Sequence, residues 1–142
     1  MKNLLSKRIL NKYSRQIILK DVGIIGQKKI FNSKILVVGA GGLGSPVIDL
    51  LARAGVGFLG VIENDKVDYS NLHRQTLYDY NDVGKYKSDV IRKKIKSINK
   101  KIKLKIFKER ANDKNLSKIL PKFDIIVDGT DNFPTKFSLK FR

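Results

Sequence analysis

Apolar residues recur along this chain with two different periods, and these predict alternating strands and helices. Short runs rich in β-branched residues predict buried strands. The Lys-Leu-Lys-Ile alternation that begins at residue 103 instead predicts a strand with one wet face near a sheet edge. The expected strands are 34–38, 58–62, 103–108 and 123–127, and the expected helices are 4–12, 22–31, 43–54, 86–99 and 113–120.

Two of the predicted helices show a distinct apolar face. The residues that share a face in helix 43–54 are Leu43, Val47, Leu50, Leu51 and Ala54. In helix 86–99, Ile91, Ile95 and Ile98 are expected to face the core, with lysines outside. Between the two helices, residues 63–84 form a long irregular stretch, and loops of that length inside compact domains are usually functional.

The order strand, glycine turn, helix, strand over residues 34–62 is a βαβ unit, which favours parallel strands and right-handed crossovers. We therefore expect an α/β fold with a Rossmann-like, doubly wound, mainly parallel sheet. One domain is expected over 1–142, with 1–33 as its N-terminal helical segment. Strand 123–127 would need a neighbour on its far side, so we expect the domain to be incomplete after about four strands.

The amino-acid composition excludes several kinds of functional site. The chain has no cysteine and a single histidine, which excludes disulfides, a cysteine nucleophile and a zinc site within its 142 residues. No apolar run approaches the about 20 residues of a membrane span, and charges interrupt every apolar stretch near the N-terminus. We expect a cytoplasmic protein with no membrane partner.

The net charge of +17 raises the hypothesis of a nucleic-acid partner, since nine basic residues and no acidic one lie between Arg92 and Lys108. However, lysine, isoleucine and asparagine are abundant and alanine is scarce, as AT-rich coding would produce. The lysines also fall on the outward faces of a predicted helix and strand. We therefore expect a solvated surface and not a nucleic-acid partner.

The stretch KILVVGAGGLGSP at 34–46 places a glycine-rich turn between a strand and a helix. Gly39 permits the tight turn, Gly41 lets the backbone approach a phosphate, and Gly44 lets the helix pack against the strand. The free N–H groups of the helix N-terminus favour an anion. Glu63 ends the next strand, where an acidic residue would bind ribose hydroxyls. These features predict a nucleotide site without distinguishing NAD from ATP.

Three further residues favour ATP. Asn71 and Arg74 in SNLHRQ (70–75) and Lys87 in VGKYKSD (83–89) are expected to converge above the strand ends. Two cations and an amide exceed what a diphosphate bridge needs, and they suit a triphosphate attacked at phosphorus. Asp131 in DGTDN can hold Mg²⁺ against the phosphates, and Asp128 is either a second ligand or a strand-end cap.

With these motifs in place, the chain resembles the N-terminal half of the ThiF/MoeB/HesA family. These are adenylyltransferases for the sulfur-carrier proteins of thiamine and molybdopterin synthesis, and relatives of ubiquitin-activating enzymes. The matching stretches are YSRQI (13–17), GQKKIFNSKILVVGAGGLGSP (26–46), AGVG (54–57), SNLHRQTL (70–77), VGKYK (83–87) and DGTDNFPTKF (128–137). They cover nearly the whole chain from Tyr13 onward, in the family's order.

The resemblance implies roles for individual residues. The nucleotide-binding residues are Gly39, Gly41, Gly42, Gly44, Glu63, Asn71, Arg74 and Lys87. Glu63 stands where the family usually has aspartate. The catalytic residues are Arg74, Lys87, Asp131 and Arg15. Asp131 is also the Mg²⁺-associated carboxylate, and Arg15 reaches the ATP site of a neighbouring subunit, which implies a homodimer. In the implied reaction, the C-terminal glycine of a small ubiquitin-like sulfur carrier becomes an acyl-adenylate.

Family members are longer than this chain, and their second half carries the carrier-protein groove and CxxC pairs for zinc. No residue here matches those parts, so we expect a truncated form of the domain. Four alternatives remain open. They are a non-catalytic nucleotide-binding module, an ATP-dependent dehydratase acting on modified tRNA, an NAD(P)-dependent oxidoreductase and a basic nucleic-acid-binding protein.

Overall fold

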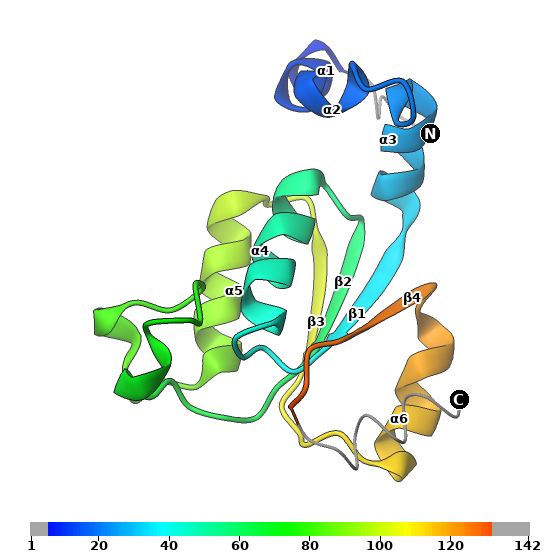
Figure 1. Ribbon diagram of the computed structural model, residues 1–142. Coiled ribbons are helices and arrows are strands. Elements are labelled where there is room, and N and C mark those ends of the chain that lie inside the picture. Colours follow the sequence, from blue (N-terminus) through cyan, green and yellow to red (C-terminus); the bar gives the residue numbers. More distant parts are fainter. Residues whose placement is uncertain (1–5, 132–142) are drawn as a thin grey trace.

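The computed structural model describes residues 6–131, which form a parallel sheet with helices on both faces (Figure 1). The strands are β1 (Lys34–Val38), β2 (Phe58–Ile62), β3 (Lys103–Phe107) and β4 (Ile125–Asp128). The helices are α1 (Lys7–Lys12), α2 (Ser14–Ile17), α3 (Gly23–Asn32), α4 (Gly44–Ala54), α5 (Lys87–Ile98) and α6 (Asp113–Ile119), and three single 3-10 turns are η1 (Tyr69–Asn71), η2 (Tyr80–Asp82) and η3 (Leu120–Lys122). Among the described residues, no helix has the length and apolar character that a membrane span requires.

The sheet has the strand order β3-β2-β1-β4, and every neighbouring pair is parallel. In β1, Val38 lies opposite Ile62 of β2 on one side and Asp128 of β4 on the other. The carboxyl ends of these three strands therefore meet at one edge, where ligands bind in sheets of this kind. The predicted α/β, Rossmann-like architecture is confirmed.

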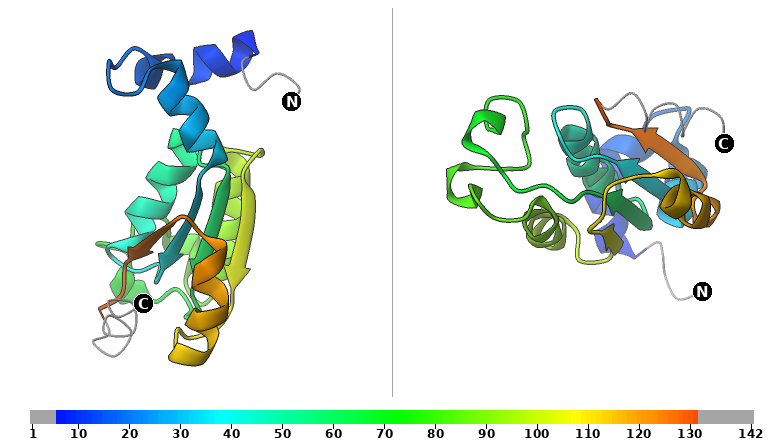
Figure 2. Two further views of the ribbon diagram at one scale, coloured as in Figure 1. Left: turned by 90° about the vertical axis from the view of Figure 1, so that its right-hand side faces the viewer. Right: turned by 90° about the horizontal axis from the view of Figure 1, so that it is seen from below.

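Each face of the sheet has its own apolar core. Figure 2 shows α4 and α5 on one side of the sheet and α6 on the other. On the first side, Val37, Leu59 and Val61 pack with residues of α4 and α5. On the second, Leu36 and Val38 pack with Leu116 of α6. Because side chains alternate along a strand, β1 contributes to both cores and is buried on both faces.

The apolar face predicted for helix 43–54 packs on the sheet only in part. Val47 and Leu51 pack against the core, but Leu43 and Leu50 are 67% and 64% exposed, whereas Gly44, Ile48 and Ala52 are buried. One cause is the short distance between α4 and β1: a Cβ atom on Gly44 would overlap the carbonyl oxygen of Gly39. The helix therefore turns the line through Gly44, Ile48 and Ala52 toward the sheet.

The prediction of a buried strand at 123–127 was also wrong in part. The strand forms as β4, but Ile125 is 51% exposed and Ile126 is 36% exposed. Within the described residues β4 pairs with β1 alone, so it is an edge strand. β3 lies at the opposite edge, as its alternating lysines predicted.

The N-terminal helices α1–α3 lie beyond the amino-terminal end of β1, away from the carboxyl ends of the strands (Figure 1). Two glutamines attach this segment to α4: Gln16 and Gln27 both donate to the carbonyl of Ala54, at 3.2 and 3.0 Å. Buried Tyr13 packs edge-on against Phe31. Helix α2 was not predicted, because its four residues are too few to show a period.

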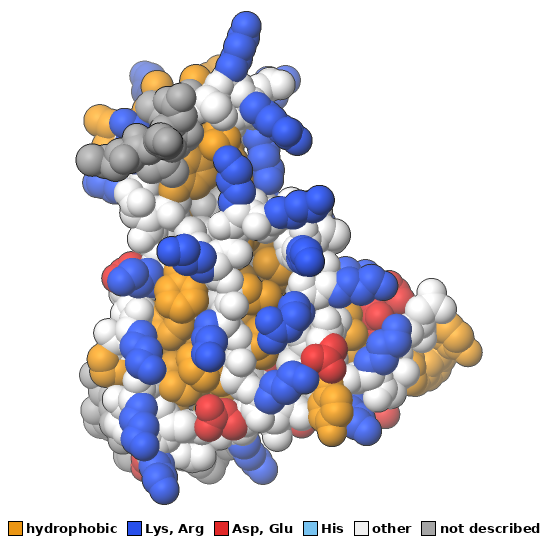
Figure 3. Space-filling view, turned by 180° about the vertical axis from the view of Figure 1, so that it is seen from behind, with side chains coloured by type: hydrophobic (Ala, Val, Ile, Leu, Met, Phe, Trp, Pro, Cys, Tyr) orange, Lys and Arg blue, Asp and Glu red, His pale blue; other side chains and the backbone are white. Residues whose placement is uncertain are grey.

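Positive charge is spread over the surface. Figure 3 shows Lys and Arg side chains scattered over one face among hydrophobic and uncharged residues. Two of the cations of the segment 92–108 form ion pairs, Lys94 with Asp79 and Lys108 with Asp89. Most lysines of this segment are exposed, on α5, on β3 and in the turn between them.

Candidate functional site

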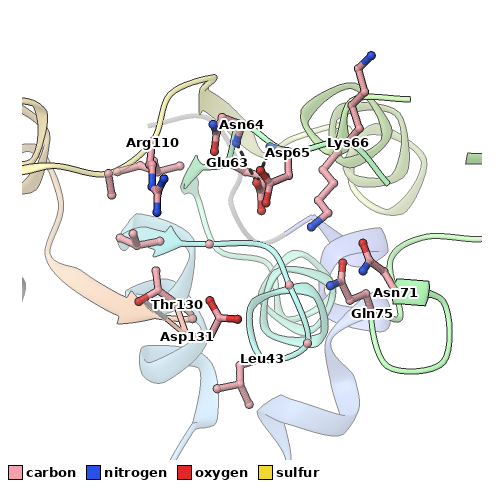
Figure 4. Close-up of a pocket in the computed structure, with 18 of the residues that line it drawn as sticks. Leu43, Glu63, Asn64, Asp65, Lys66, Asn71, Gln75, Arg110, Thr130 and Asp131 are labelled. Carbon is pink, nitrogen blue, oxygen red and sulfur yellow. Dashed lines mark hydrogen bonds between the residues drawn. The ribbon is translucent and has the colours of Figure 1, made fainter. Parts of the chain in front are cut away.

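A cavity of ≈ 1060 Å³ opens at the carboxyl ends of the strands (Figure 4). Its walls come from the glycine turn after β1, the end of β2, the loop 64–75, the first residue of α5, and the segments that follow β3 and β4. These parts are far apart in sequence, and the parallel register of the strands brings them together. The volume is slightly above the range usual for small-molecule sites, which is about 300–1,000 Å³.

The glycine turn forms the floor of the cavity. Gly39 has a φ of 84°, in the left-handed region that favours glycine. Gly41 and Gly42 line the cavity, whereas Gly44 is buried behind it and lines no part of it. In the first turn of α4, the Ser45 N–H donates to the Gly41 carbonyl at 2.9 Å and Pro46 has no N–H, so the donors left for an anion are the N–H groups of Gly41 and Gly42, which have no partner among the described residues. The glycine turn therefore presents backbone donors to the cavity.

Glu63 connects the end of β2 to the glycine turn. Its carboxylate is buried and accepts three backbone hydrogen bonds, from Ala40 at 2.9 Å and from Asn64 and Asp65 at 2.8 Å each. A carboxylate has about four acceptor positions, so one position on Oε2 remains for a ligand. The neighbouring Asp65 is exposed, lines the cavity and has no side-chain partner among the described residues. The two carboxylates lie on the same wall (Figure 4).

Lys87 provides a positive charge at the cavity wall. The residue is only 4% exposed, lines the cavity, and forms no ion pair or hydrogen bond through its ammonium group with any described residue. Its Nζ lies 5.8 Å from the centre of the Tyr78 ring. The Lys87 backbone N–H donates to the carbonyl of Asp65 at 3.0 Å, which fixes the start of α5 beside the β2 end. The ammonium group thus lacks an anion.

Tyr78 is a second side chain that binds the backbone of the glycine turn. Its hydroxyl donates to the carbonyl oxygen of Ala40 at 2.8 Å, and the residue is buried. Burial raises the pKa of the Tyr78 phenol far above its usual value, and the negative charges of Glu63, Asp65 and Asp82 raise it further. The phenol therefore remains a hydrogen-bond donor throughout the ordinary pH range.

Asn71 is the last residue of the turn η1, and Arg74 comes three residues after it. The Oδ1 of Asn71 accepts from the Asp68 backbone at 3.2 Å, which leaves its N–H₂ group without a partner among the described residues. The guanidinium of Arg74 donates to the Ser70 carbonyl at 3.0 Å. The Arg74 side chain also lies against Gly42. Both residues line the cavity, as predicted.

The end of β4 contributes Asp131, which lines the cavity and is exposed, with no partner among the described residues. Asp128 behaves differently: it lines no part of the cavity and accepts hydrogen bonds from the N–H and hydroxyl of Thr130, at 2.9 and 2.6 Å. Of the two roles left open for Asp128, the structure supports the strand-end cap. Asp131 is the free carboxylate of this wall.

The structure thus brings together most of the predicted site, namely Gly39, Gly41, Gly42, Glu63, Asn71, Arg74, Lys87 and Asp131. Arg15 lies elsewhere, exposed on α2, and lines no part of this chain's own cavity. Residues that we did not predict also line the cavity: Gln75, Lys66, Glu109 and Arg110. The signal for Arg110 was its place just after β3, at the same sheet edge. The signal for Gln75 was its adjacency to Arg74.

Comparison with known proteins agrees with this geometry. The sequence model of the ThiF family matches residues 13–141. The chain belongs to the ThiF family. A sulfur carrier protein adenylyltransferase from Thermus thermophilus is 44% identical over 132 residues, which are 93% of this chain and 49% of that protein. The adenylyltransferase and sulfurtransferase MOCS3 of Culex quinquefasciatus is 42% identical over 135 residues, 95% of this chain and 31% of that protein.

Solved structures of the ThiF fold are similar as well. Escherichia coli MccB with ATP has a TM-score of 0.77 at 32% identity, over 87% of this chain and 38% of that one. The E. coli tRNA N6-threonylcarbamoyladenosine dehydratase TcdA with ATP has a TM-score of 0.88 over 96% of this chain and 56% of that one. At 24% identity, the likeness to TcdA shows the fold alone. The chain spans about a third to a half of the length of its curated relatives.

Proposed function

We propose that this chain is the ATP-binding part of an adenylyltransferase that activates the C-terminal glycine of a ubiquitin-like sulfur-carrier protein. The observation that carries the proposal is Lys87, a buried residue that lines the cavity and whose ammonium group has no ion pair or hydrogen bond with any described residue. An unpaired ammonium group held at a cavity wall attracts an anion, and a phosphate group would supply the negative charge.

The rest of the phosphate site supports a triphosphate over a diphosphate bridge. Arg74 and Asn71 line the same cavity as Lys87, and Gly41 and Gly42 of the glycine turn add backbone N–H donors. A redox cofactor needs its pyrophosphate held but not attacked, and the glycine turn alone can do that. Several side-chain donors in one cavity suit a reaction in which a phosphate gains negative charge.

The proposed reaction needs no cysteine. A carboxylate oxygen of the carrier's terminal glycine attacks the α-phosphorus of ATP and forms a new P–O bond. The bond to the oxygen that bridges the α- and β-phosphates breaks, and pyrophosphate leaves with the electron pair. Lys87 and Arg74 oppose the charge that develops on the phosphoryl oxygens, while the glycine turn holds the group in place. The product is an acyl-adenylate.

The nucleoside end of ATP would lie against the wall that Glu63 and Asp65 form at the end of β2. Glu63 has one acceptor position left on Oε2, which suffices for only one of two ribose hydroxyls. Asp65 is exposed to the cavity next to it and offers a full carboxylate. We assign the ribose to both residues together.

The residues present also fit a magnesium ion. Mg²⁺ in phosphoryl-transfer sites is held by one or two carboxylates together with substrate phosphates and water. Asp131 is such a carboxylate, because it lines the cavity and has no partner among the described residues. When bound, the ion would neutralise phosphate charge and orient the leaving pyrophosphate.

The named relatives support the carrier protein as the partner, since one of them is a sulfur carrier protein adenylyltransferase. A homodimer and a cytoplasmic location belong to the same proposal. In the dimer, Arg15 of one subunit would complete the ATP site of the other, which agrees with its exposed position outside its own cavity. The similarity to the tRNA dehydratase supports no second function, because it shows the fold alone.

The test is carrier-dependent exchange of pyrophosphate into ATP. We expect exchange when a sulfur carrier ending in glycine is added to the adenylyltransferase that contains this chain, and the variant Asp131→Ala to lose it. Asp21→Ala is the matched control, because Asp21 is an exposed aspartate outside the cavity. Exchange that is as fast in Asp131→Ala as in the wild type would contradict the proposal.

A further inference from the structure

Gln75 is a buried side chain whose burial the fold does not explain. The residue is 4% exposed and lines the cavity, yet its amide forms no hydrogen bond with any described residue, and its Oε1 is completely buried without a partner. Most buried polar side chains have a partner, because an unsatisfied one loses its bonds to water without compensation. A group kept in this state calls for an explanation.

Gln27 shows what a structural glutamine looks like in the same molecule. It is 1% exposed, and both ends of its amide are engaged: Nε2 donates to the Ala54 carbonyl at 3.0 Å, and Oε1 accepts from Gln16 at 2.7 Å. These bonds attach the N-terminal helices to α4. Gln75 makes no comparable bond, so its amide does not stabilise the fold by holding two elements together.

The position of Gln75 indicates what it binds. Its Nε2 lies 3.6 Å from the point that a Cβ atom on Gly41 would occupy, so the amide lies beside the glycine turn. Figure 4 shows the Gln75 and Asn71 amides close to each other at the cavity wall. The terminal torsion of a glutamine is broad, which lets the amide turn toward a ligand. A phosphate offers acceptors only, so the N–H₂ group would face it.

We propose that Gln75 is a phosphate-binding residue, which donates from Nε2 to a phosphoryl oxygen of the nucleotide held by the glycine turn. This inference rests on the proposed function. It adds to that function the donor Nε2, which has no partner among the described residues and becomes engaged when the nucleotide binds. The cost to the free protein lies in the buried Oε1, which is unsatisfied when the side chain holds Nε2 at the cavity wall, and such a loss of stability is found at binding sites.

The inference makes two linked predictions for Gln75→Met, which keeps the unbranched shape and removes the polar atoms. The melting temperature of the free protein should stay the same or rise, because no hydrogen bond is lost. The affinity for Mg·ATP should fall roughly tenfold or more, as expected when a hydrogen bond to a charged group is removed. Gln75→Glu, which places a negative charge beside the phosphates, should bind ATP more weakly still.

Gln27→Met is the matched control. It should lower the melting temperature, because two buried hydrogen bonds disappear, and leave the ATP affinity of the folded protein unchanged. Calorimetric titration with Mg·ATP and with inorganic tripolyphosphate gives the affinities. Gln75→Met should weaken both ligands, since the lost contact is to phosphate.

The outcomes separate this inference from the proposed function. If the wild type binds ATP and Gln75→Met binds it equally well, Gln75 is not a phosphate ligand, and the proposed function stands. If Gln75→Met unfolds or melts well below the wild type, Gln75 is structural, and the inference fails. If the wild type binds neither ATP nor tripolyphosphate, the proposed function fails and the inference fails with it.

Discussion

The carboxylate of Glu63 accepts a hydrogen bond of 2.9 Å from the backbone N–H of Ala40, and this bond joins the end of β2 to the glycine turn. The same carboxylate accepts from Asn64 and Asp65, so one buried side chain fixes two loops of the cavity. Glu63 was expected from the sequence as a ribose ligand. The structure shows that the residue also positions the backbone that would hold the phosphates.

This arrangement predicts the effect of Glu63→Gln. The variant keeps the shape, but its N–H₂ end cannot accept the backbone N–H groups that one carboxylate oxygen now binds. We expect the free energy of unfolding to fall by about 1–3 kcal/mol. Chemical denaturation measures it. Glu109→Gln is the control, because Glu109 is exposed and accepts only from Asn115, at 2.8 Å. Equal stability of the two variants would contradict the positioning role.

Substitutions at two glycines of the turn should have different effects, one on ligand binding and the other on stability. A Cβ atom on Gly41 meets nothing closer than 3.6 Å but projects beside the cavity, so Gly41→Ala should keep the wild-type stability and lose ATP affinity. On Gly44 the same atom would overlap the Gly39 carbonyl oxygen. Gly44→Ala should therefore lose about 3 kcal/mol or more of stability. Thermal melting and ATP titration of both variants check this, and a stable Gly44→Ala would refute the packing argument.

Lys87→Met tests the unpaired charge. Removing an ammonium group that has no ion pair or hydrogen bond among the described residues should leave the free protein about as stable as the wild type, because no such contact is lost. ATP affinity should fall at least about tenfold. Lys85→Met is the control, since Lys85 is exposed and pairs with Asp82 at 3.5 Å outside the cavity. A large loss of stability in Lys87→Met would mean that Lys87 serves the fold.

Tyr78 gives a pH-dependent prediction. Because burial raises the pKa of its phenol in the folded state, the neutral form contributes stability that is complete below pH about 10 and lost as the pH rises beyond it. Tyr78→Phe removes the 2.8 Å bond to Ala40, so it should cost about 1 kcal/mol at neutral pH. Its stability should then fall less steeply than that of the wild type at alkaline pH. Parallel alkaline denaturation curves would contradict the assignment.

The sequence predicted the sheet and the location of the site because both depend on short local patterns. Apolar runs marked β1 and β2, and the carboxyl ends of parallel strands converge whatever the details of the loops. The buried face of α4 could be predicted only in part. Val47 and Leu51 pack on the core as expected, but the close approach of Gly44 to Gly39 turns Gly44, Ile48 and Ala52 toward the sheet and leaves Leu43 and Leu50 exposed. That constraint comes from the tertiary structure and leaves no period in the sequence.

The candidate site, too, could be predicted only in part from the sequence. Asn71, Arg74 and Lys87 could be proposed from motif and spacing, but their spacing did not show that Lys87 is buried and unpaired. Gln75 was missed because a single buried polar side chain has no sequence signature. Its role becomes visible only when its absent hydrogen bonds are compared with those of Gln27. The strand ends predict where ligands bind, and unsatisfied groups indicate which ligand.

The most direct test of the central claim is calorimetric titration of the wild-type chain with Mg·ATP, with NADH titrated alongside. We expect saturable binding of ATP at one site per chain, loss of that binding in Lys87→Met, and no comparable affinity for NADH. Tight binding of NADH without binding of ATP would contradict the proposed ATP site and would mean that the glycine turn binds a redox cofactor.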